Sequence, residues 1–155
     1  QGKKDPYLKD SDFYLAFVLL ADSKFALQEE DYDRALAVTD NLSAKLREYR
    51  MRSYIPEALY LQAQALRGLG QDEAARNTLL EARAEAEAMN ARRPLWPILF
   101  SLSQLETDLT KAEHLRQQSQ QIVEYIAVHT PTPELRASFL ALPDVVAVFE
   151  PTSND

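Results

Sequence analysis

Six long segments of this chain space their apolar residues at the interval of an α-helix, and each is bounded by residues that start or stop helices. The predicted helices cover roughly residues 12–28, 31–50, 57–68, 71–89, 94–108 and 110–128. With three glycines among 155 residues, a turn-rich β fold is disfavoured. The sequence therefore predicts an all-α fold.

Local chemistry sets where several of these helices begin and end. The hydroxyl of Ser11 is expected to cap the first helix, and Gly68-Leu69-Gly70 is expected to end the third, because glycine adopts the left-handed conformation that many helix ends require. Pro97 is acceptable in the fifth helix if it lies in the first turn, where its missing amide has no partner.

The C-terminal part of the chain predicts a shorter seventh helix after Thr132-Pro133-Glu134, where an oxygen cap precedes a proline and a carboxylate. Its apolar face comprises Leu135, Phe139, Leu140 and Leu142, and Pro143 is expected to end it. The stretch from Asp144 to Phe149 stays open between a last helical turn and an extended tail. Residues 1–10 are expected to be a flexible leader and residues 150–155 a disordered tail.

Three alanines divide the long helices into pairs. Short connections join helices one to two and three to four, so these neighbours are expected to be antiparallel hairpins. Ala35, Ala75 and Ala112 lie near the start of the second helix of each pair, about 40 and 37 residues apart. A small side chain at that place lets two helices approach closely, and we expect three equivalent crossings.

The middle pair resembles a tetratricopeptide repeat. The residues that carry the resemblance there are Leu59, Ala63, Leu66, Gly70, Ala75, Leu79 and Ala82. Asp31-Tyr32-Asp33-Arg34-Ala35-Leu36 is similar to the family's opening of a second helix, and Trp96-Pro97-Ile98-Leu99 to part of a first helix. The resemblance implies a right-handed stack of three antiparallel helix pairs with a C-terminal capping helix, over residues 11–149.

Over most of residues 55–146, the arrangement is similar to the helical-repeat regions near the C-termini of large bacterial signalling proteins, such as regulatory ATPases, cyclases and transcription activators. That resemblance is carried by Arg93-Pro94-Leu95-Trp96, Ala112-Glu113-His114-Leu115-Arg116 and Leu135-Arg136-Ala137-Ser138-Phe139-Leu140. It implies a protein-interaction scaffold within a larger signalling or regulatory protein. The alternative is a ligand-sensing domain that controls an attached ATPase or DNA-binding unit.

Charge and composition narrow the partners. A formal charge of −7 disfavours nucleic acid and anionic lipid, which require a basic face. The longest apolar run, residues 14–21, is shorter than the roughly 20 residues of a spanning helix. No cysteine, histidine pair or phosphate-binding loop is present, so we expect no metal, no cofactor and no enzymatic activity. A protein or peptide partner and a cytoplasmic location are the expectations that remain.

If the pairs stack as tetratricopeptide repeats do, the first helix of each pair lines a concave surface. The residues expected there are Phe17, Leu20 and Lys24 in the first pair, Glu57, Tyr60, Gln64 and Arg67 in the second, and Ser101 and Gln104 in the third. Tyrosine and arginine are common at interfaces because they combine a large contact area with polar ends. The alternative is that these side chains are plain solvated helix surface.

Four further features have a functional and a structural interpretation. The basic group of Lys45, Arg47, Arg50 and Arg52 could meet an acidic partner or phosphate, although favourable charge at a helix end explains it more simply. The acidic run 29–33 lacks the spacing of a calcium loop and is typical of a helix start. His114 and His129 form no metal motif, and Trp96 is expected to fill space between hairpins.

Overall fold

The computed structural model describes residues 6–151, with side chains from residue 11 onward, and in this range the chain is helical without a strand. The predicted all-α class is confirmed for this part of the chain. The chain divides into two compact units, residues 1–85 and 86–155.

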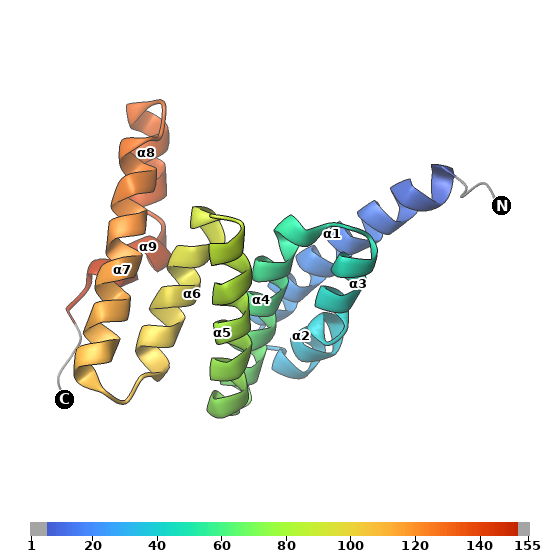
Figure 1. Ribbon diagram of the computed structural model, residues 1–155, viewed down its shortest axis with the longest axis horizontal. Helices are drawn as coiled ribbons and strands as arrows, with labels where there is room; N and C mark the ends of the chain where they lie inside the picture. The colour runs from blue at the N-terminus through green and yellow to red at the C-terminus, as the bar shows by residue number, and fades with distance from the viewer. Residues whose placement is uncertain (1–5, 152–155) are drawn as a thin grey trace. The chain divides into compact units, whose positions relative to one another are not determined.

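The first unit contains four helices, a short 3-10 turn and most of a fifth helix (Figure 1). In chain order they are α1 (Pro6–Gln28), α2 (Tyr32–Thr39), α3 (Leu42–Glu48), η1 (Arg52–Tyr54), α4 (Ile55–Gly68) and α5 (Asp72–Ala88). Helix α1 contacts α2, α3 and α4, and α2 also contacts α4.

Helix α1 begins at Pro6, earlier than predicted. Proline suits a first helical turn because its fixed φ fits the helix and its missing amide would have no partner there. Ser11 therefore lies inside the helix and does not cap it, and residues 6–10 of the expected leader are helical. Residues 1–5 lie outside the described residues.

The single helix predicted over residues 31–50 is two helices, α2 and α3, separated at Asp40 and Asn41. Aspartate and asparagine favour turns, because their side chains compete for backbone hydrogen bonds. Just before the break, the Thr39 hydroxyl donates to the carbonyl of Ala35 at 2.8 Å. The start of α2 is as predicted, since the Asp31 carboxylate accepts from the Arg34 amide at 3.2 Å.

Helix endings in and just after the first unit recur at an interval of 40 residues. Four residues have a left-handed backbone, namely Glu30 (φ 56°), Arg50 (φ 60°), Gly70 (φ 73°) and Asn90 (φ 52°). Glu30 and Gly70 follow α1 and α4, whereas Arg50 and Asn90 follow α3 and α5. The predicted stop at Gly68-Leu69-Gly70 is therefore confirmed, and non-glycine residues take the same conformation at the equivalent ends.

Backbone hydrogen bonds repeat with the same interval. The amide of Asp31 donates to the carbonyl of Ala26, and the amide of Gln71 donates to that of Leu66, each at 2.9 Å. The corresponding bonds at the other two ends are Met51 to Leu46 (2.8 Å) and Ala91 to Ala86 (2.9 Å). Hydrogen bonds of this kind, from an amide to the carbonyl five residues earlier across a left-handed residue, are typical of the Schellman motif at a helix end. The ends of α1, α3, α4 and α5 thus share one geometry.

Small residues form the crossing of α1, α2 and α4. Ala26, Ala35 and Ala65 are fully buried in one cluster, which Leu27 and Leu36 flank. Beside it, the ring of Tyr32 lies so close to Gly68 that a Cβ there would approach ring atoms closer than 3.0 Å. Gly68 therefore has a packing role besides its place at the end of α4.

The second unit contains the end of α5 and helices α6 (Arg92–Leu105), α7 (Leu109–Val128), α8 (Pro133–Leu140) and α9 (Pro143–Phe149). Helix α6 begins two residues before Pro94, so Pro97 lies in its second turn. The prediction that Pro97 lies in the first turn is therefore wrong. Helix α6 ends at Leu105, earlier than the predicted end near Asp108. Asp108 instead caps α7, accepting from the amides of Thr110 (3.0 Å) and Lys111 (3.2 Å).

The crossing of α6 and α7 differs from the crossings in the first unit. Ala112 is only half-buried, whereas Ala35 and Ala75 are completely buried. The connection between α6 and α7 is extended at Glu106 and Asp108, so it contains neither the left-handed residue nor the backbone closure found at the ends of α1, α3, α4 and α5. The expectation of three equivalent alanines is therefore wrong for the third.

A side-chain hydrogen bond joins α6 to α7 instead. The buried hydroxyl of Ser119 on α7 donates to the carbonyl of Trp96 on α6 at 2.8 Å. Trp96 itself is half-buried in the second unit.

The C-terminal segment is helical to Phe149. Thr132 caps α8 as predicted, accepting from the Leu135 amide at 3.2 Å, and the segment left open by the sequence forms α9. Val145 and Val148 of α9 are buried. The apolar face predicted for the seventh helix, however, is largely exposed. Leu135 and Leu140 of α8 and Leu142 after it are exposed, and α8 has no buried residue. Residues 152–155 of the expected tail lie outside the described residues.

Candidate functional site

Helices α1 and α4 present one shared surface in the first unit. The Lys24 ammonium on α1 lies 2.5 Å from a Glu57 carboxylate oxygen on α4. The ring of Phe17 meets the ring of Tyr54, the last residue of η1, edge-on, with centroids 5.1 Å apart. The Lys24–Glu57 ion pair therefore joins one candidate residue of each helix, and the Phe17 contact lies just before the start of α4. We call Phe17, Lys24, Glu57, Tyr60, Gln64 and Arg67 the α1–α4 surface.

The four α4 members of this surface follow one another at intervals of three and four residues, so they form a single stripe along the helix. Each of them is half-buried, while Phe17 and Lys24 on α1 are exposed. Leu20 differs, because it is 4% exposed and belongs to the core of the first unit. Its inclusion among the partner-facing residues is therefore wrong.

The two candidate residues on α6, Ser101 and Gln104, differ in exposure. Ser101 is 3% exposed, so it cannot offer a surface to a partner in this structure. Gln104 is exposed, and it borders a hollow of 440 Å³ within the second unit. Helices α6, α7 and α9 and the two residues after α9 supply the lining of this hollow, which consists of Phe100, Ser103, Gln104, Leu109, Ala112, Glu113, Arg116, Ala147, Glu150 and Pro151.

Arg116 forms the polar wall of this hollow and ties α7 to the end of α9. Its guanidinium donates to the carbonyl of Glu150, and its Nε lies 3.5 Å from a Glu113 carboxylate oxygen. The Nε is buried and has no hydrogen bond, because the Glu113 contact is an ion pair without that geometry. Nearby, Gln120 donates to the carbonyl of Val148 at 3.0 Å. The hollow thus has an apolar floor with one cation and two carboxylates at its edge.

Of the residues around the hollow, only Gln104 was predicted from the sequence to face a partner. Phe100 and Leu109 are ordinary apolar positions of predicted helices, and their place at a hollow depends on how α9 folds back on α7. The sequence could have drawn attention to Leu109, because this large apolar residue directly follows an aspartate, a residue type that caps helices. In the structure, Asp108 caps α7 and Leu109 is 81% exposed.

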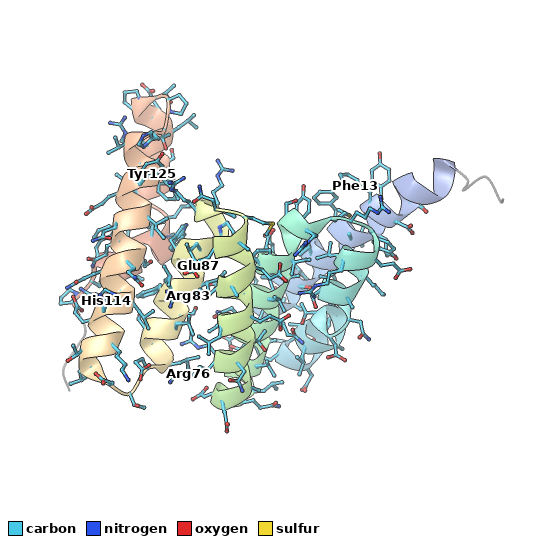
Figure 2. The ribbon with its side chains drawn as sticks, viewed as in Figure 1. Phe13, Arg76, Arg83, Glu87, His114 and Tyr125 are labelled. Carbon is cyan, nitrogen blue, oxygen red and sulfur yellow. The ribbon has the colours of Figure 1, made fainter. Side chains whose placement is uncertain are left out.

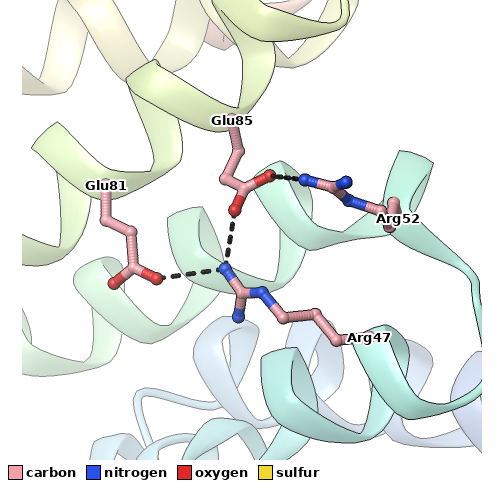
Figure 3. A network of polar contacts seen from close by, with 4 residues as sticks. All are labelled: Arg47, Arg52, Glu81 and Glu85. Carbon is pink, nitrogen blue, oxygen red and sulfur yellow. Dashed lines mark hydrogen bonds and ion pairs between the residues drawn. The ribbon is translucent and has the colours of Figure 1, made fainter.

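The basic group near the end of α3 finds acidic partners within its own unit (Figure 3). Arg47 contacts Glu85 at 2.7 Å and Glu81 at 3.3 Å, and Arg52 lies 3.6 Å from Glu85. The hydrogen bond that Arg47 donates to the Glu85 carboxylate raises the pKa of Arg47 above its usual value. Two of the four basic residues therefore fasten α3 and η1 to α5.

The two histidines lie on α7 and at its end (Figure 2 labels His114 and Tyr125). His129 stacks on the Tyr125 ring with centroids 3.9 Å apart, and the Arg92 guanidinium lies 4.3 Å from the centroid of the same ring. Among the described side chains, no three His, Asp or Glu residues gather in a group that could hold a metal ion.

No family model, curated protein or solved structure matches this chain. Within residues 6–151, no helix has the length and apolar character needed to cross a bilayer.

Proposed function

We propose that this chain is a protein-interaction scaffold whose α1–α4 surface binds a segment of a partner protein. The observation that carries the proposal is the alignment of aromatic, basic and amide side chains over two adjacent helices, joined by the Lys24–Glu57 ion pair. Such mixed surfaces suit protein interfaces, because large rings supply contact area while charged groups select the partner.

The proposed framework is a pair of tetratricopeptide-like hairpins, the first formed by α1 with α2 and α3, the second by α4 with α5. The 40-residue recurrence of left-handed ends and their hydrogen bonds supports it, as do the buried Ala35 and Ala75. The contact of α4 with both α1 and α2 also fits two successive repeats, because each repeat in such arrays packs on its neighbour.

The experiment compares the protein with the double variant Tyr60→Ala/Arg67→Ala as bait in an extract of the native cells, followed by calorimetry with the partner recovered. Both positions are half-buried, so the double variant should keep its helical circular dichroism while its affinity falls about tenfold or more. Val128→Glu, which alters an exposed residue of α7, is the control and should retain the partner. Equal affinity of all three proteins would exclude the α1–α4 surface.

The hollow of the second unit favours one alternative, a ligand-sensing regulatory domain. Its 440 Å³ lies in the range of small-molecule sites, and its floor is apolar with a few polar groups. Ala112→Phe should obstruct it, because the ring would extend from the lining of the hollow. A small molecule retained from a cell extract by the protein but not by this variant would support sensing, whereas equal retention would locate binding elsewhere.

A further inference from the structure

The Arg116 guanidinium beside the hollow of the second unit is bonded on one side and open on the other. Its Nη1 donates to the carbonyl of Glu150, directly after α9. Among the described residues, none accepts a hydrogen bond from its Nε or its Nη2. These two nitrogens lie on the same edge of the planar group, the edge that binds both oxygens of a carboxylate in two parallel hydrogen bonds.

The nearest carboxylate does not fill this edge. Glu113 lies one turn earlier on α7, with one oxygen 3.5 Å from the Arg116 Nε and no hydrogen bond to it. Its other oxygen accepts from the side-chain amide of Gln117 at 3.0 Å. Glu113 therefore provides an opposite charge near the guanidinium but leaves its donors unsatisfied. Because a buried donor without an acceptor costs stability, the Nε–Nη2 edge is suited to an acceptor from outside the chain.

The rest of the hollow is suited to an apolar group. Phe100 on α6 and Ala112 on α7 are half-buried, as is Ala147 on α9, which lies against α7 (Figure 1). Leu109 lines the same hollow and is 81% exposed, so an apolar ligand there would remove a large side chain from water. The volume of 440 Å³ is in the range of small-molecule sites.

The charges around the hollow favour an anion over a cation. The Arg116 side chain is 14% exposed, whereas the side chain of Glu113 is 48% exposed. Glu150, the other acidic residue of the lining, is also exposed. Water screens exposed carboxylates more strongly than a largely buried guanidinium, so the cation dominates the field inside the hollow. The formal charge of −7 on the whole chain opposes an anion only weakly, because distant exposed charges are screened by salt.

We propose that the hollow binds a small apolar carboxylic acid. Its carboxylate accepts hydrogen bonds from Nε and Nη2 of Arg116, and its hydrocarbon part lies against Phe100 and Leu109. Since Nε is buried beside Glu113, the exposed Glu113 side chain moves outward to admit the ligand and competes with it for the guanidinium. The inference rests on the ligand-sensing alternative for its site and names the ligand class; it does not depend on the α1–α4 surface.

Three compounds with one hydrocarbon body test the ligand class, namely phenylpropionate, phenylpropanamide and phenylpropylamine. Each is titrated at neutral pH into the isotopically labelled full chain, and amide resonances are followed by NMR. Phenylpropionate should shift the resonances of residues 100–116 and 147–151, with a dissociation constant on the order of 1 mM for so small a ligand. The neutral amide and the cationic amine should bind about tenfold more weakly or less. Equal affinities, or no shift with phenylpropionate at about 10 mM, would overturn the proposal.

Substitution of Glu113 tests the competing carboxylate. Glu113→Ala should strengthen the binding of phenylpropionate about threefold to tenfold, because a like charge leaves the site. Glu124→Ala removes the same charge from an exposed position of α7 outside the hollow, and it should leave the affinity unchanged. Weaker or equal binding by Glu113→Ala would contradict the proposed competition.

Arg116→Lys tests the two parallel hydrogen bonds, because lysine keeps the charge but lacks the planar fork. It should weaken the binding of phenylpropionate about tenfold. Arg136→Lys is the matched control, since Arg136 on α8 also donates to a backbone carbonyl, that of Ala127, and does not line the hollow. Glu113→Ala keeps the bond from Arg116 to Glu150, so the test does not depend on whether Arg116→Lys folds. Unchanged affinity in a folded Arg116→Lys protein would overturn the carboxylate site.

Ala112→Phe distinguishes an error in the ligand class from an error in the site. It should abolish the shifts caused by phenylpropionate, because the ring obstructs the hollow. If all three compounds bind equally and all lose their binding in Ala112→Phe, the hollow is a ligand site and the carboxylic-acid class is wrong. If none of them shifts the resonances of the hollow, the inference is wrong, and retention of a molecule from cell extract decides the ligand-sensing function separately.

Discussion

Replacing Gly68 with alanine tests the close contact between α4 and the Tyr32 ring of α2. In an exposed helix this change stabilises by about 0.4–1 kcal/mol, because alanine restricts the unfolded chain. Here the new Cβ would lie within 3.0 Å of three atoms of the Tyr32 ring, including the atom that joins the ring to its own Cβ. The ring cannot clear the methyl by a small rotation, so α2 must shift from α4.

Overpacking of this kind costs about 1–3 kcal/mol, which exceeds the gain in helix propensity. The net effect should therefore be a loss of about 1–2 kcal/mol, or a fall in Tm of about 4–16 °C for a unit of this size. Thermal and urea unfolding followed by circular dichroism measure it. A two-state fit should be checked first, because the two units can unfold separately.

A double-mutant cycle identifies the cause. In a Tyr32→Ala background, Gly68→Ala should no longer destabilise, which gives a coupling energy of about 1–3 kcal/mol. Gly70→Ala is the matched control, because Gly70 has a φ of 73° and no neighbour within 4 Å of its Cβ position. Its cost comes from backbone strain and should be the same in both backgrounds. A Gly68→Ala protein that is more stable than the parent, or a cost that persists without the tyrosine ring, would refute the packing argument.

Three other substitutions have expected outcomes that unfolding experiments can check. Ala75→Trp should destabilise by about 1–3 kcal/mol because Ala75 is fully buried, whereas Ala112→Trp should cost much less because its methyl borders the hollow; equal costs would show that the two sites are alike. Ser119→Ala removes the bond to the Trp96 carbonyl and should cost about 1–2 kcal/mol, with no recovery in Ser119→Val. Glu85→Gln should cost less than about 1 kcal/mol, and the difference should shrink in 1 M salt because the arginine pairs are partly exposed.

Local chemistry in the sequence was sufficient to locate most helix ends. Thr132 and Asp31 cap helices where their side chains predict it, and Gly70 takes the left-handed conformation that glycine favours. Such features depend on a few neighbouring residues, so no knowledge of the distant chain is needed. The same reasoning missed the break at Asp40, because periodicity on both sides of it is helical and only the competing turn preference separates α2 from α3.

The sequence was less successful at predicting which side of each helix is buried and which is exposed. The sequence placed Leu20 and Ser101 on a partner-facing side, yet both are buried, and it treated Ala112 as the equivalent of Ala35 and Ala75. A periodic pattern gives the angle between residues around one helix, but it does not say which side meets a neighbour. That choice depends on contacts between segments far apart in the chain.

The sequence alone determined that this chain is helical and fixed the ends of most helices, because propensity and capping act over a few residues. The tertiary structure alone decided which apolar faces are filled. Packing joined Lys24 to Glu57 across two helices, formed the hollow beside α6, α7 and α9, and left Tyr14, Val18 and Phe25 of α1 exposed. Burial is a property of neighbours brought together by folding, and one helix cannot specify its neighbours by its own periodicity.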